Sequence, residues 1–341
     1  MQTLCSAPAK LILSGEHAAL YNCPALSLAI KLHSHCEATF IAQPKHTISI
    51  ELSDYQQHKN LSFENWHNLA IDIESRYQLF EKQVTAIQSV LSKPIDLILV
   101  ILHHFDMFHS LEKGQWHFKI YSNIPIGRGI GSSAAIIMSV LGSLFKHHKI
   151  NNAQQDILKL AQQIECRQHG KSSGIDTSTV LLGGLIEFRN GQVQKQKNHN
   201  LEAWLIDTGK PGSSTGQAVS SVKKHFANNQ TIWQEFERVT QQVIQAWSDQ
   251  NRMQLLNAIA QNQNLLETIG VVPDKVKLLI QLLKKHYNAT AKVCGSGSVK
   301  GDNAGIVLCF SEQKPTQLCE KFGYSIQKVS IDTEGTICQQ T

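Results

Sequence analysis

The segment IPIGRGIGSSAA, residues 124–135, carries three glycines at alternate positions followed by two serines. Glycine tolerates positive φ and has no Cβ, so such a run either makes a difficult turn or lets backbone N–H groups approach a ligand closely. A helix that starts after the loop would present unpaired N–H groups and a positive dipole end, which suit phosphate. The spacing matches neither the P-loop nor the dinucleotide fingerprint. The loop alone therefore leaves a phosphate site and a tight turn both open.

A lysine, a glutamate and a histidine lie close together near the start of the chain. They are Lys10, Glu16 and His17, within the segment APAKLILSGEHAALYNCPAL. A lysine in a mostly apolar strand is either paired with an anion or extends its ammonium group to solvent. His17 is as well explained by a core position as by a binding role, so these residues by themselves leave both explanations open.

Two carboxylates flank a glycine turn in the segment ECRQHGKSSGID. Glu165 and Asp176 are of the type that serves as a general base or as a ligand to a hard cation. Taken by themselves, Glu165 is better explained as a solvated helix residue and Asp176 as the N-cap of the next turn. The sixteen histidines include no H-E-x-x-H and no H-x-x-x-H arrangement, so a metal hydrolase is not indicated.

The glycine loop is predicted to join a strand to a helix. The preceding WHFKIYSNI alternates apolar and polar residues as a half-buried strand does, and the following SSAAIIMSVLGSLFKHH has apolar residues at helical spacing. Ser132 or Ser133 is the expected N-cap. A second helix is predicted over 153–169, with Gly170 as its stop.

The rest of the chain predicts an α+β protein. LILSG, ALSLAIKLHSHCEATFIA and HTISIEL predict a sheet, QLFEKQVTAIQSVLSK predicts a long helix before the buried run IDLILVIL, and VLLGGLIEFRNG predicts a hairpin. AWLIDTG, ATAKVCGSGS, AGIVLCF and YSIQKVSI predict strands around three or more amphipathic helices between about 216 and 288. Regular βαβ alternation is absent, which favours α+β architecture. A length of 341 residues suggests two domains, which we place at 1–195 and 196–341 because QVQKQKNHN is the best boundary.

The three segments together resemble the GHMP kinase family, named for galactokinase and for homoserine, mevalonate and phosphomevalonate kinases. The first is similar to that family's A-P-G-K-x-x-L-x-G-E-H motif, and the glycine loop is similar to its P-x-G-x-G-L-G-S-S-A-A phosphate loop. HGKSSGID and DTGKPGSST resemble most closely the mevalonate kinase branch. The resemblance implies two domains, one similar to ribosomal protein S5 domain 2 and one ferredoxin-like.

The resemblance also implies roles for individual residues. Asp176 would take the proton of the attacking hydroxyl, with Lys10 beside it as charge stabiliser. Ser133 and Glu165 would be ligands to Mg²⁺. The ATP phosphates would lie against Pro125, Gly127, Arg128, Gly129, Ile130, Gly131, Ser132 and Ser133. The acceptor would contact Glu16, His17, Ser173, Gly295 and Ser296.

The implied reaction is ATP-dependent phosphorylation of the 5-hydroxyl of (R)-mevalonate in isoprenoid precursor synthesis. Phosphomevalonate kinase, or another small-alcohol kinase of the family, is the first alternative. A diphosphomevalonate decarboxylase and a non-catalytic metabolite sensor are further alternatives. An intact Lys10, Glu165 and Asp176 argue against the sensor.

The third motif of the family matches poorly. The chain has KVCGSGSVKGDNAG where the family has a run of glycines, so Ser298, Val299 and Lys300 replace glycines. We expect the segment 298–303 to cover the phosphates and the acceptor all the same. Ala9 stands where the family has glycine and needs only an ordinary negative φ.

Composition limits the remaining possibilities. A net charge of +5 with dispersed basic residues suits small anions and falls short of a nucleic-acid footprint. No apolar run is long enough to span a bilayer, and no leader peptide is recognisable, so we expect a cytoplasmic protein without membrane partners. The eight cysteines form no C-x-x-C pair and are expected to be reduced thiols. Besides the small-molecule substrate, a second copy of the chain, as a homodimer, is the one partner considered.

Overall fold

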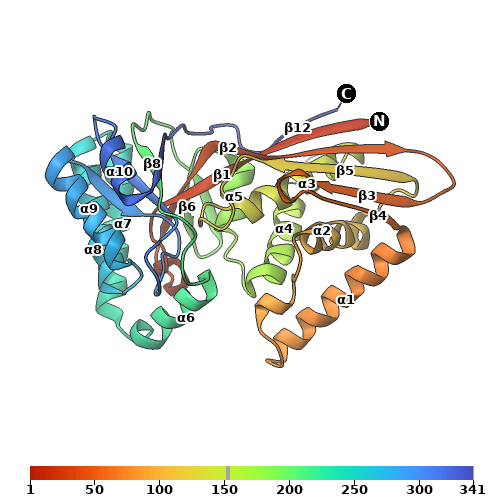
Figure 1. Ribbon diagram of the computed structural model, residues 1–341, viewed down its shortest axis with the longest axis horizontal. Helices are drawn as coiled ribbons and strands as arrows, with labels where there is room; N and C mark the ends of the chain where they lie inside the picture. The colour runs from red at the N-terminus through yellow and green to blue at the C-terminus, as the bar shows by residue number, and fades with distance from the viewer. Residues whose placement is uncertain (151–153, 341) are drawn as a thin grey trace.

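Two β-sheets with helices packed against them make up the computed structural model, which describes residues 1–150 and 154–340 (Figure 1). The larger sheet has eight strands and the order β12-β1-β2-β5-β3-β4, with β6 and β7 added beside β2. The smaller sheet has four strands in the order β11-β8-β10-β9. The predicted α+β class is therefore confirmed. None of the helices in the described ranges has the combined length and apolarity that crossing a bilayer requires.

The strands are β1 (Gln2–Ser14), β2 (Ala25–Ile41), β3 (Thr47–Leu52), β4 (Gln57–Ser62), β5 (Gln115–Ser122), β6 (Leu185–Arg189), β7 (Gln192–Lys195), β8 (Trp204–Asp207), β9 (Thr290–Val293), β10 (Ile306–Phe310), β11 (Ser325–Lys328) and β12 (Ile337–Gln340). The helices are α1 (Phe63–Glu81), α2 (Pro94–His109), α3 (Ser132–His147), α4 (Gln154–His169), α5 (Ile175–Leu182), α6 (Thr215–Phe226), α7 (Gln230–Ser248), α8 (Arg252–Thr268), α9 (Asp274–Tyr287) and α10 (Thr316–Phe322).

The larger sheet is built on two long antiparallel strands, β1 and β2. Helix α3 packs against both strands, and α2, α4 and α5 pack around α3. Because α3 is enclosed in this way, its apolar residues are almost all buried. The helix that follows the glycine loop is thus the centre of this half of the molecule, which fixes the loop at its start.

The predicted helix over QLFEKQVTAIQSVLSK is wrong in position. Helix α1 starts earlier, after Ser62, whose side chain accepts a hydrogen bond from the backbone N–H of Asn65, and it ends at Glu81. The later part of the predicted segment holds a turn and a short 3₁₀ helix at 87–89. The apolar run IDLILVIL is the buried helix α2, which begins at Pro94, the residue type best tolerated in a first helical turn.

Two other boundaries also differ from the sequence prediction. The hairpin consists of β6 and β7 only, because residues 180–182 complete helix α5. Helix α4 is described from Gln154, so its predicted first residue, 153, lies outside the described residues. Its stop at Gly170 has the expected left-handed conformation, with φ of 80°.

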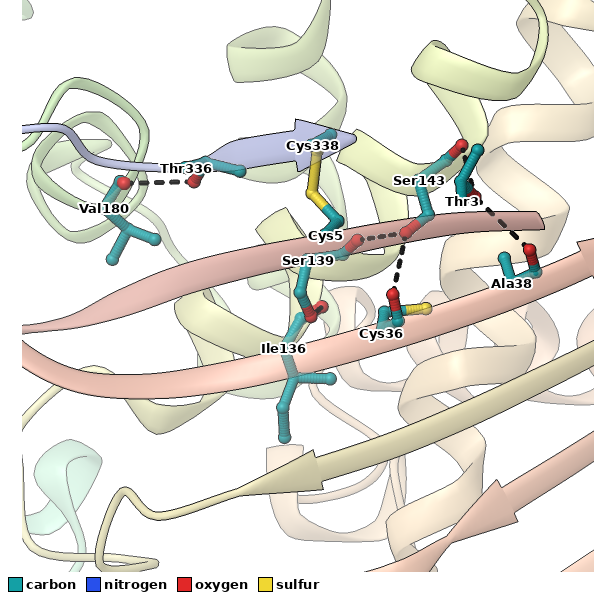
Figure 2. Close-up of a disulfide and its surroundings, with 10 residues drawn as sticks. All are labelled: Thr3, Cys5, Cys36, Ala38, Ile136, Ser139, Ser143, Val180, Thr336 and Cys338. Atoms are coloured by element: carbon teal, nitrogen blue, oxygen red, sulfur yellow. Dashed lines mark hydrogen bonds between the residues drawn. A yellow bond between two sulfur atoms is a disulfide. The ribbon is translucent and has the colours of Figure 1, made fainter. Parts of the chain in front are cut away.

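A disulfide joins the first and last strands of the chain, Cys5 on β1 to Cys338 on β12 (Figure 2). This corrects the expectation that all eight cysteines are reduced thiols; the other six are free. The two residues are direct neighbours in the antiparallel pairing of β1 with β12. A sequence separation of 333 residues hides that proximity from any local pattern. Both sulfurs lie over Gly142 of α3, where an added Cβ would be 2.5 Å from the Cys5 sulfur.

The C-terminal segment returns from the smaller sheet to the larger one, so the two chain ends lie side by side (Figure 1). On the way, the Thr336 hydroxyl donates to the Val180 carbonyl of α5 at 3.0 Å (Figure 2). Asp332 accepts a hydrogen bond from the His33 ring at 2.9 Å. The last residues therefore brace the helix that carries Asp176.

Candidate active site

The glycine loop joins β5 to α3 as predicted. All three alternate glycines adopt backbone conformations that favour glycine. Gly127, Gly129 and Gly131 have φ of 69°, 78° and 74°, a region that residues with a Cβ rarely adopt. Gly127 and Gly129 are exposed. The loop therefore presents backbone, rather than side chains, to whatever lies against it.

Helix α3 begins without a side-chain cap. Gly131, in the left-handed conformation, is its N-cap, which corrects the prediction that Ser132 or Ser133 has that role. These two serines are instead the first two helical residues and are half-buried. Because a helix leaves its first N–H groups without intrahelical partners, this terminus offers donors and a positive dipole end to an anion.

Lys10 and Asp176 form an ion pair beside this helix start, with 2.9 Å between Lys10 Nζ and Asp176 Oδ1. The lysine side chain is 5% exposed and the aspartate 26%. The Lys10 backbone N–H donates to the Ile130 carbonyl of the glycine loop at 3.0 Å. Gly131 also lies over the Lys10 stem, since an added Cβ there would be 2.7 Å from Lys10 Cγ. The pair is thus held against the loop, with the carboxylate open to a ligand.

Asp176 lies in the first turn of α5, and Gly174 is that helix's N-cap. The structural alternative, in which Asp176 itself caps the helix, is therefore excluded. Ser173 is exposed in the turn just before Gly174, and its hydroxyl accepts from the Ile175 N–H at 3.4 Å.

Glu165 is a buried carboxylate on α4. Burial, with the negative charge of Asp176 second, raises its pKa to about 7. Its carboxylate accepts a hydrogen bond from the Ser172 hydroxyl. A positive ion beside it would favour the ionised form and reverse this rise. The alternative of a solvated helix residue is excluded by its burial.

The donor set fits a hard divalent cation that is also held by phosphate. A buried carboxylate and a hydroxyl are the oxygen ligands that Mg²⁺ takes while keeping waters and substrate oxygens. Among the described residues, no group of three or more histidine, cysteine, aspartate or glutamate side chains could hold a metal by itself. Glu165 and Ser133 are the residues predicted to hold such a cation together with the nucleotide.

Two of the predicted acceptor residues, His17 and Ser296, are in contact. His17 Nε2 is 3.0 Å from the Ser296 carbonyl oxygen, and the Ser296 hydroxyl donates to the Thr215 hydroxyl at 3.3 Å. Burial lowers the pKa of His17, with the Ser296 carbonyl opposing, so a neutral ring is favoured near pH 7. His17 has a positive φ of 57°.

The third glycine motif contacts the phosphate loop at two points. A Cβ added at Gly295 would lie 3.0 Å from the Gly129 carbonyl oxygen, and one at Gly305 would lie 2.5 Å from that of Arg128. The Arg128 side chain pairs with Asp207 at the end of β8, at 2.7 Å. The smaller sheet therefore forms a wall along the outside of the loop.

The divergent segment 298–303 contacts residues 212 and 213, which follow β8; its place over the phosphates and the acceptor stays a prediction. The Ser298 hydroxyl accepts from the Ser213 N–H at 3.0 Å, and the Lys300 carbonyl lies 2.4 Å from a Cβ added at Gly212. The segment thus folds onto the loop after β8.

Sequence reasoning gave no role to Lys292 or Asp207. Lys292 forms a buried ion pair with Glu16, and Asp207 anchors Arg128. Both lie within segments already aligned with the family, at the end of a strand. A charged residue in a run as apolar as ATAKVCG was the available signal, because a fully buried charge requires a partner.

Comparison with known proteins finds relatives that match most of this chain. Residues 96–184 match the family model of the GHMP kinases N terminal domain. The mevalonate kinase of Pyrococcus furiosus is 27% identical over 306 residues, which are 87% of this chain and 87% of that protein. That of Methanocaldococcus jannaschii is 24% identical over 320 residues, 92% of this chain and 94% of that protein.

Solved structures share the fold. The Methanococcus jannaschii mevalonate kinase superposes with a TM-score of 0.78 at 22% identity, covering 96% of this chain and 98% of that one. A Streptococcus pneumoniae phosphomevalonate kinase bound to phosphomevalonate and AMPPNP gives 0.69 at 14% identity, covering 95% and 99%. The predicted α+β fold and the predicted resemblance to GHMP kinases are therefore confirmed, and with them the prediction of a kinase.

Proposed function

We propose that this chain, a kinase of the GHMP type, transfers the terminal phosphoryl group of ATP to the 5-hydroxyl of (R)-mevalonate, giving 5-phosphomevalonate and ADP. The observation that carries the proposal is the Lys10–Asp176 pair, which lies against the glycine loop at the start of α3. Phosphoryl transfer needs mainly positioning and charge neutralisation, and the pair stands where both would be required.

Asp176 accepts the proton of the attacking hydroxyl in this proposal. Its carboxylate is open on one side, at 26% exposure, while Lys10 holds the other side at 2.9 Å. The Lys10 ammonium places a positive charge beside the carboxylate that takes the proton. Such a base contributes about 10²- to 10⁴-fold to the rate.

The backbone N–H groups at the start of α3 hold the phosphates. Three glycines of positive φ bring this backbone close, and the helix dipole adds to the attraction. When bound, Mg²⁺ neutralises phosphate charge, and Ser133 and Glu165 are the side chains proposed to hold it. We assign the nucleotide to residues 1–195 and the wall that closes over it to residues 196–341.

The acceptor occupies the space bordered by Glu16, His17 and Ser296. Similarity to proteins named mevalonate kinase over most of the chain supports mevalonate as that acceptor. Ser173 and Gly295 complete the proposed contacts. The reaction belongs to isoprenoid precursor synthesis, and we place it in the cytoplasm.

The test is an assay of ADP release with Mg·ATP and, in separate reactions, mevalonate, phosphomevalonate or galactose. Turnover of mevalonate with a kcat/KM at least about tenfold above the other two is expected. Turnover of phosphomevalonate alone would replace the proposed acceptor, and equal inertness toward all three would refute the kinase proposal.

A further inference from the structure

Lys292 is a fully buried lysine whose ammonium group has three acceptors. It lies on β9 of the smaller sheet with its side chain 0% exposed. Its Nζ donates to the Glu16 carboxylate, to the Ile12 carbonyl at 3.1 Å and to the Val293 carbonyl at 2.7 Å. Glu16 and Ile12 belong to the chain segment of the larger sheet, so this one group ties the two sheets together.

The three acceptors use the whole capacity of the ammonium group. A lysine ammonium has three N–H donors and no acceptor. None is left for a phosphate oxygen or for the acceptor molecule. Lys292 therefore differs from a phosphate-binding lysine, and its influence on the reaction must pass through the groups that it holds.

Only one of the two carboxylate oxygens of Glu16 has a hydrogen-bond partner among the described residues. Its side chain is 1% exposed, and Oε2 is buried without a hydrogen-bond partner among the described residues. The next residue, His17, has a buried Nδ1 that likewise lacks a partner in the described chain. Burial raises the pKa of Glu16, and the charge of Lys292 opposes that rise. Glu16 and His17 thus each have one buried hydrogen-bonding atom without a partner among the described residues.

We infer that Lys292 is a positioning residue for the acceptor: by fixing Oε1 of Glu16, it aims Oε2 and the adjacent His17 ring at the acceptor molecule. This inference rests on the proposed function, because the acceptor is the ligand that lies beside these residues. A buried ion pair is by itself weak evidence for a gain in stability, since desolvation offsets the attraction. Its place between the sheets, next to two buried unpartnered polar atoms, is what points to a role in binding.

The substitution Lys292→Met tests the inference because it keeps the length of the side chain and removes its donors. We expect the KM for mevalonate to rise at least about tenfold, since the released carboxylate no longer has one orientation. The KM for ATP should change less than about threefold, because none of the three contacts of Lys292 is to the phosphate loop.

Arg189→Met is the matched control. Arg189 of β6 pairs with Glu237 of α7 at 2.5 Å, with exposed fractions of 47% and 32%. It therefore also joins the two halves of the molecule through a cation–glutamate pair, but in contact with solvent. Both KM values should stay within about twofold of the unsubstituted protein, because exposed pairs contribute little.

Unpaired Glu16 could prevent folding, so the double variant Glu16→Gln, Lys292→Met is included. It removes both charges and should fold, while the mevalonate KM remains raised by at least about tenfold. An acceptor KM that returns to within twofold of the unsubstituted value in the double variant would overturn the inference. So would equal increases of the two KM values in Lys292→Met.

Amide hydrogen exchange of the unliganded protein separates this inference from the proposed function. Exchange at residues 15–19 should be at least about tenfold faster in Lys292→Met than in Arg189→Met, with helix α3 unchanged in both. Unchanged exchange at residues 15–19 would overturn the inference even in an active kinase. Inactivity of the unsubstituted protein toward mevalonate would refute the proposed acceptor. The exchange result would then still decide whether Lys292 fixes residues 15–19.

Discussion

Two lysine–carboxylate pairs lie near the same candidate site and differ in their access to solvent. Lys10 and Asp176 are 5% and 26% exposed, whereas Lys292 and Glu16 are 0% and 1% exposed. Lys10 and Asp176 both belong to the chain of the larger sheet, while Lys292 reaches Glu16 from the smaller sheet. The same two chemical groups, an ammonium and a carboxylate, are thus placed in two different surroundings.

The difference in exposure corresponds to two different proposed roles for the carboxylates. In the proposed function Asp176 takes a proton and must meet its substrate, and its carboxylate is partly exposed while Lys10 covers one side. A carboxylate that orients a ligand can be enclosed, and the low dielectric around Glu16 makes its contact with Lys292 strong and its loss costly. Breaking the open pair should therefore impair the reaction, and breaking the enclosed pair should also impair the fold.

The largest expected effect is that of Asp176→Asn on the reaction. We expect kcat to fall by about 10²- to 10⁴-fold, because the amide cannot take the proton. The KM for ATP should stay within about threefold and the thermal midpoint within a few degrees, since the side chain is partly exposed. Steady-state kinetics and a thermal unfolding curve check both. Full activity of Asp176→Asn would contradict the proposal that the partly exposed pair acts in the reaction.

Stability should distinguish the two lysines. Lys292→Met leaves a buried carboxylate without its cation and should lower the free energy of unfolding by about 3–5 kcal/mol. Lys10→Met should cost less, about 1–2 kcal/mol, because water can solvate Asp176. Urea unfolding followed by circular dichroism measures both. Equal losses would mean that the difference in exposure has no energetic consequence.

The disulfide between Cys5 and Cys338 is a covalent link to set beside these ionic ones. Protein purified without reductant and then unfolded should titrate six thiols with Ellman's reagent, against eight after reduction. Cys338→Ser should lower the free energy of unfolding of the oxidised protein by about 2–4 kcal/mol. Eight thiols without reductant would restore the sequence prediction of reduced cysteines.

Glu74 offers a third carboxylate for the comparison, with a side chain that is 20% exposed. Although burial opposes the change, hydrogen bonds from His104 and Arg167 lower its pKa from 4.5 to about 2. A lowered native pKa stabilises the fold above pH 4.5, and this contribution is lost as the pH falls from about 4.5 through about 2. Glu74→Gln should remove about 1–3 kcal/mol at pH 7 and little at pH 2. A loss independent of pH would show that the charge is not responsible.

Much of the site could be predicted because its parts are local in sequence. The glycines of the loop, the strand before it and the helix after it follow from residue type and periodicity over about twenty residues. Lys10 stood out as a charged residue in a mostly apolar strand. Glu165 and Asp176 received their predicted roles from the resemblance to GHMP kinases. The N-cap was predicted wrongly because two serines suggested a side-chain cap, whereas Gly131 makes the turn with its backbone alone.

The contacts between distant segments could not be predicted in the same way. The pairing of Lys292 with Glu16 spans 276 residues, and the disulfide spans 333. The position of helix α1 was also missed, because the surface that buries it comes from α2 and β4. Periodicity reports which face of an element is apolar, but it does not report what lies against that face.

By itself, the sequence determined the local features: a glycine loop between a strand and a helix, a lysine, two carboxylates and their order along the chain. Local backbone preferences depend on near neighbours, so they can be read from a single chain. Only the tertiary structure decided which lysine pairs with which carboxylate. The packing of two sheets leaves Asp176 open beside Lys10 and encloses Glu16 against Lys292, and burial is what makes identical groups behave differently.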